Sequence, residues 1–229
     1  MEGVDMQLDG VILDIDGTLV LSNDAHTQSW VESFASHGYE VPYDQVRPLM
    51  GMGGDQLMPK LIPELNDEEE PGKTIASGHK ELVLTKYRPQ LKPTNGARAL
   101  VEKLFADGLH VVVATSASER ELAVMLEVAD VKDLLHETTT SADAENSKPA
   151  PDIVEAALRK AQLDPDRVVM LADTPYDIEA AGKAGVKVIA VRSGGFSDEE
   201  LEGAIAIYDD PADLLHHYDR SPLGQAAAG

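Results

Sequence analysis

The sequence predicts an α/β fold in which a parallel sheet carries helices on both faces and an all-helical domain is inserted near the start. In the second half of the chain, short apolar runs alternate with segments of helical periodicity, which is typical of parallel sheets. Residues 20–93, the helical segment, show helical patterns only and are too long for a simple crossover. We therefore expect a core domain of residues 1–19 and 94–229, with residues 20–93 as an inserted domain.

The first predicted strand, residues 10–16, ends in two carboxylates. A continuous apolar run at residues 11–13 suits a central strand buried on both faces. Because side chains alternate along a strand, Asp14 and Asp16 should point the same way. Paired carboxylates at a buried strand end are costly unless they are neutralised, and a divalent cation with oxygen ligands would do this. Two solvated loop aspartates are the alternative, which the flanking apolar residues disfavour.

The helical segment is predicted from cap residues, chain breakers and spacing. Favoured N-cap residues occur at 22–24, and Gly38 offers a stop for the helix that follows them. A glycine-rich turn at residues 50–55 leads into the stretch 56–58. We expect helices at residues 22–38, 44–48 and 75–87, with an acidic loop at residues 66–72.

From residue 93 onward the pattern becomes an alternation of strands and helices. Gly108 and Gly185 are suitable stops for helices, and Pro151 suits the first turn of one. We expect strands at residues 109–114, 136–140, 167–171, 186–191 and 204–208, helices at residues 95–106, 119–128, 151–161, 177–184 and 213–218, and a frayed tail at residues 222–229.

Small hydroxyls follow the second predicted core strand, and a lysine precedes a later helix. Thr115 and Ser116 come directly after residues 109–114, where hydroxyls and free N–H groups can hold phosphate oxygens. Lys148 lies between a loop and a proline-initiated helix, a more rigid frame than a surface lysine needs. Ordinary loop hydroxyls and an exposed lysine are the alternative interpretations.

Two further carboxylates follow the predicted strand at residues 167–171. Asp173 and Asp177 are four residues apart, so one helical turn would bring them close together. The alternative interpretation is that one of them only caps the helix. Because parallel strands present their carboxyl ends at one edge of a sheet, we expect a ligand site there.

Four segments of the chain, taken in order, resemble the sequence motifs of the haloacid dehalogenase superfamily. They are DIDGTLV from residue 14, TSAS from residue 115, SKPAPD from residue 147 and LADTPYD from residue 171. Helices inserted after the first motif are similar to those of C1-capped members, including phosphoglycolate phosphatase and β-phosphoglucomutase-like proteins. The resemblance implies a Rossmann-like core with a helical cap. Ala172 replaces the usual glycine of the fourth motif, which removes no functional group.

The resemblance also implies a reaction, a phosphatase acting on a small phosphorylated metabolite through an aspartyl phosphate on Asp14. Asp16 would serve as the acid and base, and Lys148 would neutralise the nucleophile and the phosphoryl oxygens. Thr115 is favoured as the second-motif residue, with Ser116 supplying contacts beside it. The resemblance further implies Mg²⁺, held by the Asp14 carboxylate, the Asp16 backbone carbonyl and Asp173, with Asp177 as a partner of Lys148 or of a metal-bound water.

The helical segment offers weaker candidates for substrate recognition, namely His26 and the turn residues Gly53 and Gly54. The substrate itself is left open by the residues. The main alternative is a β-phosphoglucomutase-like isomerase, whose cap would need basic side chains that residues 51–55 do not offer before Lys60. The presence of Asp16 argues against a dehalogenase, which would not need it. A phosphonatase would need a distinctive cap lysine, and no lysine of the helical segment stands out. A non-catalytic phosphate-binding module would not need all of the catalytic residues that the four motifs supply.

The amino-acid composition of the chain limits the classes of partner that it can bind. The chain has 19 basic and 41 acidic residues, a formal charge of −22, which disfavours nucleic acid and anionic membranes. It contains no cysteine, which excludes disulfides and a cysteine nucleophile. No apolar run approaches the length of a membrane span, and no signal pattern begins the chain. We expect a cytoplasmic enzyme, monomeric or homodimeric, with a small metabolite as its partner.

Overall fold

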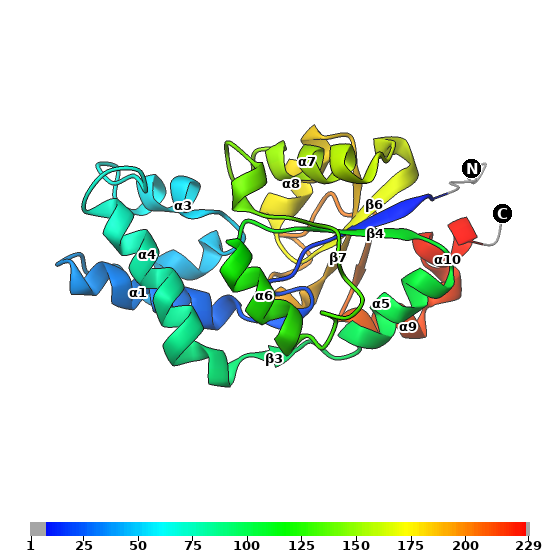
Figure 1. The fold of residues 1–229 in the computed structure, drawn as a ribbon, viewed down its shortest axis with the longest axis horizontal. Coiled ribbons are helices and arrows are strands. Elements are labelled where there is room, and N and C mark those ends of the chain that lie inside the picture. Colours follow the sequence, from blue (N-terminus) through cyan, green and yellow to red (C-terminus); the bar gives the residue numbers. More distant parts are fainter. Residues whose placement is uncertain (1–7, 228–229) are drawn as a thin grey trace.

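The computed structural model describes residues 8–227 and contains a six-stranded parallel sheet (Figure 1). The strand order is β5-β4-β1-β6-β7-β8, so the first strand lies in the interior of the sheet as its apolar sequence predicts. The predicted α/β class is confirmed. The strands are β1 (Gly10–Leu13), β4 (His110–Ala114), β5 (Thr138–Thr139), β6 (Val168–Ala172), β7 (Lys187–Val191) and β8 (Ala206–Tyr208).

The register of the central strands brings their carboxyl ends to one edge. Leu13, the last residue of β1, pairs with Val113 of β4 on one side and with Leu171 of β6 on the other. The residues that follow these three strands therefore meet at the same edge of the sheet. Asp14, Thr115 and Asp173 all occupy such positions.

Helices cover both faces of the sheet, and alternate side chains of β1 contact them. Val11 and Leu13 belong to one buried cluster, together with apolar residues of α5, α6 and α9. Ile12 belongs to a second cluster, built with α7 and α8 on the opposite face (Figure 1). These helices are α5 (Ala97–Ala106), α6 (Glu119–Val128), α7 (Asp152–Ala161), α8 (Pro175–Lys183) and α9 (Pro211–His216).

The helical segment lies to one side of the sheet and has a buried cluster of its own (Figure 1). Trp30 and Phe34 of one helix pack with Leu57, Met58 and Ile75 of two others. The last α-helix of this segment, Gly72–Leu82, continues into a π-helical turn at Val83–Tyr87. The α-helices of this segment are α1 (Asn23–Ser36), α2 (Tyr43–Val46), α3 (Gly54–Leu61) and α4 (Gly72–Leu82).

The prediction that residues 20–93 contain helices only was wrong at the two ends of the segment. Val20–Leu21 (β2) and Lys92–Pro93 (β3) form an antiparallel pair, in which Val20 lies opposite Pro93 and Leu21 opposite Lys92. Two-residue strands are too short to show alternation in a sequence. The pair joins the two connections between the helical segment and the sheet.

The first and last predicted elements also differ from the structure. β1 ends at Leu13 rather than at residue 16, because the backbone turns at Gly17, whose φ is +75°. The tail is not frayed up to residue 227, because Pro222–Ala227 forms α10. Leu223 of this helix is fully buried in the cluster beneath α5 and α9. Residues 1–7, and residues 228–229 at the end of the predicted tail, lie outside the described residues.

Replacing Leu223 by Ala should lower the free energy of unfolding by about 2–4 kcal/mol, because it opens a cavity against the main core. Urea unfolding followed by circular dichroism measures the change. The matched control is Leu21→Ala, at a leucine that is 47% exposed, which should shift stability by less than about 0.5 kcal/mol. Equal effects would show that α10 contributes nothing to the core.

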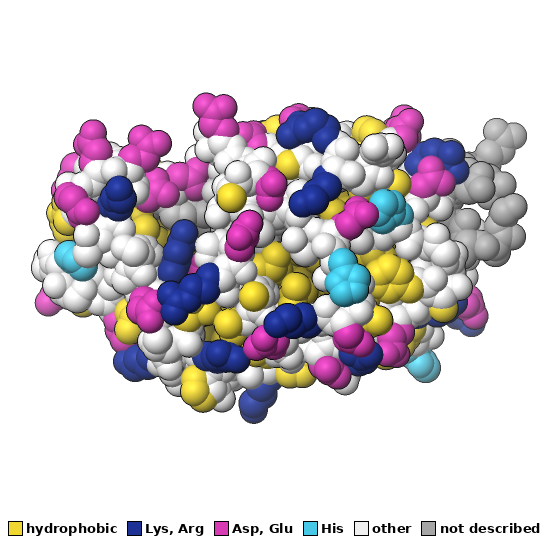
Figure 2. Space-filling model, viewed as in Figure 1, with side chains coloured by type: hydrophobic (Ala, Val, Ile, Leu, Met, Phe, Trp, Pro, Cys, Tyr) yellow, Lys and Arg dark blue, Asp and Glu magenta, His cyan; other side chains and the backbone are white. Residues whose placement is uncertain are grey.

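Charged side chains of both signs are spread over the visible face of the molecule, with acidic groups frequent at the rim (Figure 2). Among residues 8–227, no helix combines the length and the apolar character that crossing a membrane would require.

Candidate active site

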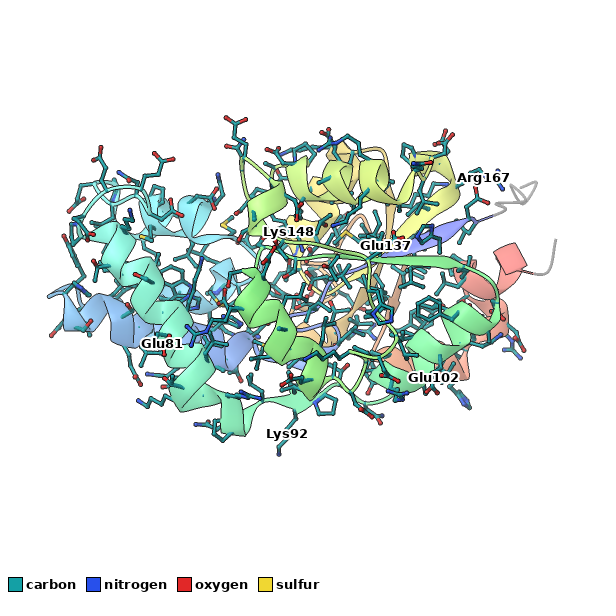
Figure 3. All side chains as sticks on the ribbon, in the orientation of Figure 1. Glu81, Lys92, Glu102, Glu137, Lys148 and Arg167 are labelled. Carbon is teal, nitrogen blue, oxygen red and sulfur yellow. The ribbon has the colours of Figure 1, made fainter. Side chains whose placement is uncertain are left out.

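A buried lysine bridges two of the predicted carboxylates. Lys148 Nζ lies 2.6 Å from Asp14 Oδ1 and 2.6 Å from Asp177 Oδ1, and it also donates to the backbone oxygen of Ala114 at 3.3 Å. The Lys148 side chain is 2% exposed, near the junction of sheet and helical segment (Figure 3). The loop before α7 thus places its cation directly behind the end of β1.

Lys148 and the neighbouring carboxylates change one another's pKa values. Burial raises the pKa of Asp14 to about 7 against the attraction of Lys148, and repulsion by Asp177 adds to the rise. Burial by itself would lower the pKa of Lys148, but the attraction of Asp14 and Asp177 outweighs it and holds that pKa above its ordinary value. The cationic form of Lys148 is therefore the one that this pocket stabilises.

Asp173 completes the carboxylate group at the strand ends. Its Oδ1 accepts a hydrogen bond from Thr18 Oγ1 at 3.1 Å, and its Oδ2 accepts one from Asn23 Nδ2 at 2.8 Å. The same Thr18 hydroxyl lies 3.3 Å from Asp14 Oδ2. Complete burial raises the pKa of Asp173 well above its ordinary value, and the charges of Asp14 and Asp177 add to this. The group thus holds more negative charge than Lys148 alone offsets.

Two glycines leave room for Asp173. A Cβ atom at Gly17 would lie 2.0 Å from Asp173 Oδ2, and one at Gly194 would lie 1.7 Å from the same oxygen. The Gly194 carbonyl also accepts hydrogen bonds from Asn23 and from Arg47 of the helical segment. Any side chain at these positions must displace the carboxylate.

Replacing Gly194 by Ala should therefore destabilise the fold by about 1–3 kcal/mol and weaken divalent-metal binding, because the new methyl group overlaps Asp173. Thermal unfolding and Mg²⁺ titration by calorimetry measure the two effects. Gly182→Ala is the control, since a Cβ there meets nothing within 4 Å and lies in α8; it should stabilise the protein slightly. A Gly194 variant that binds metal normally would contradict this account.

Asp16 lies in a separate set of contacts from Asp14. Its Oδ1 accepts a hydrogen bond from Ser22 Oγ at 2.5 Å and lies 3.0 Å from His26 Nε2. Burial would raise the pKa of Asp16, but the charge and hydrogen bond of His26 and the bond from Ser22 hold it below its ordinary value. In turn, Asp16 raises the pKa of His26 against the effect of burial. Asp16 is thus kept as a carboxylate beside a histidine of α1.

The two hydroxyl residues that follow β4, Thr115 and Ser116, differ in their hydrogen bonds. Thr115 is held by its backbone N–H, which donates to the Thr139 carbonyl at 3.1 Å, and its Oγ1 accepts from Ala117 N at 3.1 Å. Ser116 Oγ is buried and has no hydrogen-bond partner. An unsatisfied hydroxyl beside free space is available to bind a ligand oxygen.

The predicted site residues surround one pocket between the sheet edge and the helical segment. Its empty space is about 830 Å³, including the open mouth. All of the predicted residues line it except Asp173 and Asp177, which lie behind Asp14 and Lys148. The helical segment adds Trp30, Met50, Met52 and Lys80 to the wall.

The turn containing Gly53 and Gly54 packs against the loop before α7 on one side and against α1 on the other. A Cβ at Gly53 would lie 2.1 Å from Ser147 Oγ, and one at Gly54 would lie 3.2 Å from the Trp30 ring. Beside them, Asp55 Oδ2 accepts a hydrogen bond from Ser147 N at 3.0 Å. The helical segment therefore contacts the residue next to Lys148.

The buried carboxylates fit a hard divalent cation. One oxygen from each of Asp14, Asp173 and Asp177 lies within 4.8 Å of the others. All of these donors are oxygen atoms, and burial with mutual repulsion raises the pKa of Asp14 and Asp173. Cations such as Mg²⁺ take oxygen ligands of this kind, and a bound cation would relieve that repulsion.

Several contact residues were not predicted from the sequence. Ser22 and Asn23 were expected to cap α1, but Ser22 makes no side-chain cap hydrogen bond and both side chains bind site carboxylates instead. Thr18, His79 and Glu121 were not singled out. The position of Thr18 within the first motif is a local signal, whereas His79 meets His26 across 53 residues of sequence, which no local pattern reports.

Several known proteins are similar to this chain, and phosphatases are among them. The chain is 29% identical over 214 residues to a phosphoglycolate phosphatase from Rhodospirillum rubrum, covering 89% of this chain and 88% of the relative. It is 27% identical to a phosphorylated carbohydrates phosphatase from Thermotoga maritima, covering 91% and 97%. It is also 30% identical to Protein SUPPRESSOR OF QUENCHING 1, chloroplastic, from Arabidopsis thaliana, but spans only 18% of that longer protein.

A solved structure and a family model extend the likeness. The crystal structure of a hydrolase from Pseudomonas syringae superposes with a TM-score of 0.86 at 27% identity, covering 92% of this chain and 98% of the other. A family model described as haloacid dehalogenase-like hydrolase matches residues 11–191. The sequence-based prediction of a hydrolase of this kind is confirmed. The chain belongs to the haloacid dehalogenase-like hydrolase family.

Proposed function

We propose that this enzyme is a Mg²⁺-dependent phosphatase that hydrolyses a small phosphorylated metabolite through an aspartyl phosphate on Asp14. The observation that carries the proposal is the Asp14 carboxylate at the end of β1, 2.6 Å from the buried cation of Lys148 and facing a pocket. The relatives named phosphoglycolate phosphatase and phosphorylated carbohydrates phosphatase support it.

In this proposal Asp14 is the nucleophile. One of its oxygens attacks phosphorus in line with the leaving oxygen, and the P–O bond to the substrate breaks as the aspartyl phosphate forms. Lys148 offsets the charge of Asp14 and of the phosphoryl oxygens, while Asp177 at 2.6 Å positions the ammonium. Ser116 Oγ, buried without a partner, and the groups around Thr115 bind the remaining oxygens.

Asp16 moves the protons. In the first half of the reaction it protonates the leaving alkoxide with the proton that it shares with His26 Nε2, 3.0 Å away, and in the second half it takes a proton from the hydrolytic water. Its contacts with Ser22 and His26 hold the carboxylate in place and keep its pKa low. The form that these contacts stabilise is the one that accepts the proton from water.

Mg²⁺ would be held by the Asp14 carboxylate, the Asp16 backbone carbonyl and Asp173, with Asp177 close to the same group. When bound, it supplies positive charge that lowers the repulsion between the nucleophilic carboxylate and the phosphoryl oxygens. Thr18 and Asn23 fix the Asp173 carboxylate at 3.1 and 2.8 Å. These hydrogen bonds keep the Asp173 carboxylate turned toward the place where Mg²⁺ would bind.

The helical segment acts as a cap in this proposal, with residues 1–19 and 94–229 as the core domain. Hydrogen bonds from Ser147 N to Asp55 and from Tyr176 Oη to the Pro48 carbonyl hold it against the core. A closed cap excludes bulk water from the aspartyl phosphate and selects the substrate, and it must open for exchange.

A sugar-phosphate isomerase is the second candidate, and one observation favours it. Lys80 of α4 lines the pocket and makes no ion pair within the described part of the chain. It could therefore bind a second anionic group of the substrate. Lys60, the first basic residue after the glycine-rich turn, does not line the pocket.

A substrate screen tests the two candidates. Purified protein with Mg²⁺ is incubated with a panel of phosphomonoesters, bisphosphates and sugar phosphates, and both released phosphate and sugar isomers are measured. We expect Mg²⁺-dependent phosphate release from at least one monoester. Isomerisation without phosphate release would favour the second candidate. If the protein showed neither phosphate release nor isomerisation, the proposal would be overturned.

A further inference from the structure

We propose that the enzyme has a second metal site, specific for a transition metal such as Zn²⁺, formed by His26, His79 and Glu121. His26 Nδ1 and His79 Nε2 are 3.1 Å apart, and a Glu121 carboxylate oxygen lies within 4.8 Å of both. Two nitrogens bound to one tetrahedral ion at about 2.0 Å would be about 3.3 Å apart. The spacing of the ligands is therefore close to that of a metal site.

Two of the three ligands are already oriented by a neighbour on their far side. His26 Nε2 contacts Asp16 Oδ1 at 3.0 Å, which leaves Nδ1 facing His79. Glu121 Oε2 accepts hydrogen bonds from the Ser118 hydroxyl at 2.6 Å and the Ser118 N–H at 2.9 Å. Carboxylates and hydrogen-bond donors behind metal ligands serve this purpose in metal sites generally.

The third ligand, His79, is fixed by packing. Its ring stacks on Trp30 with centroids 4.1 Å apart and planes 9° from parallel. The side chain is buried, and its Nδ1 has no hydrogen-bond partner. In the metal-free protein, one N–H···N hydrogen bond between the two histidines accounts for the 3.1 Å contact, and a metal ion would replace that proton.

Glu121 gives an independent reason to expect a cation. It is only 2% exposed, and among residues 8–227 the positive charge that acts on it is that of His26, whose pKa its own charge helps to raise without an ion pair at contact distance. Buried carboxylates normally have a cationic partner or bind a metal ion. The two histidines provide the nitrogen donors with which such an ion would be shared.

The donor set separates this site from the carboxylate group around Asp14. Two imidazoles and one carboxylate favour Zn²⁺, Co²⁺ or Ni²⁺, whereas three carboxylates favour Mg²⁺. His26, His79 and Glu121 come from α1, α4 and α6. A metal ion there would link two helices of the helical segment to a helix on the sheet, across the pocket that all three residues line, and hold the two parts together.

The test measures metal binding directly and uses Trp30, the single tryptophan of the chain, as its reporter. Zn²⁺ and Co²⁺ are titrated into the full-length protein in a large excess of Mg²⁺, with equilibrium dialysis, Trp30 fluorescence and the visible spectrum of Co²⁺ as readouts. We expect one Zn²⁺ per chain, a change in Trp30 emission, and a Co²⁺ spectrum typical of nitrogen ligation.

Variants assign the site. His79→Gln and Glu121→Gln should weaken Zn²⁺ binding by at least about tenfold, and glutamine at position 121 retains the cap on α6. His37→Gln, at an exposed histidine next to the end of α1, is the matched control and should bind as the wild type does. Asp173→Asn should also keep the Co²⁺ spectrum. Absent binding, binding unchanged in both site variants, or loss only in Asp173→Asn would overturn the proposal.

Discussion

Replacing Asp14 by Asn should lower the rate of phosphate release by at least about 10⁴-fold, as the loss of an essential nucleophile does in other enzymes. The amide has almost the size of the carboxylate and can still accept a hydrogen bond from Lys148, which lies 2.6 Å away. What it lacks is the charge and nucleophilicity needed to attack phosphorus. Steady-state phosphate release with Mg²⁺, and trapping of phosphorylated protein by rapid acid quench, measure the loss.

Asp9→Asn is the control for this experiment. Asp9 precedes β1, at the opposite end of the strand from Asp14, and pairs with Arg167 at 2.6 Å outside the residues that line the pocket. Its variant should retain the rate of the wild type. If Asp14→Asn kept more than a tenth of the activity, or still gave phosphorylated protein, Asp14 would not be the nucleophile.

Replacing Lys148 by Met should destabilise the protein by about 3–5 kcal/mol, the range measured when one partner of a buried ion pair is removed. The methionine leaves Asp14 and Asp177 buried without the cation that each of them contacts at 2.6 Å. Urea unfolding at neutral pH measures the loss of stability. Phosphate release should also disappear, because no cation would offset the phosphoryl charge.

Two further variants separate charge from packing. Lys183→Met removes a surface ion pair with Glu179 and should change stability by less than about 1 kcal/mol. Adding Asp177→Asn to Lys148→Met should restore part of the lost stability, because one unpaired carboxylate disappears. If the double variant were no more stable than Lys148→Met, the destabilisation would come from lost packing instead.

The sheet and most helices could be predicted because their signals are local. The helix at residues 119–128 has the predicted bounds, since Ser118 and Glu121 form a capping box at its start. Each of the four motif segments follows a predicted strand or precedes a predicted helix. Because the strands are parallel, their carboxyl ends lie at one edge of the sheet, and this brings the four segments together. Element type and site position were therefore both available from patterns a few residues long.

The features that were missed depend on distant partners. β2 and β3 consist of two residues each and exist only because they pair with one another. Asn23 resembles a helix cap in sequence, yet its amide binds Asp173, 150 residues away. α10 is held by the burial of Leu223 rather than by its own helical propensity. No sequence window of ordinary length contains both members of these contacts.

The short β2–β3 pair has a consequence for how such enzymes diversify. Because Val20 lies opposite Pro93, the chain departs from the sheet and rejoins it at neighbouring points, so everything in between resembles an oversized hairpin loop. Insertions are best tolerated where the two ends of a loop are already close. The intervening helices could be exchanged over evolutionary time without altering the order of the six parallel strands, so that selectivity and reaction chemistry can change independently.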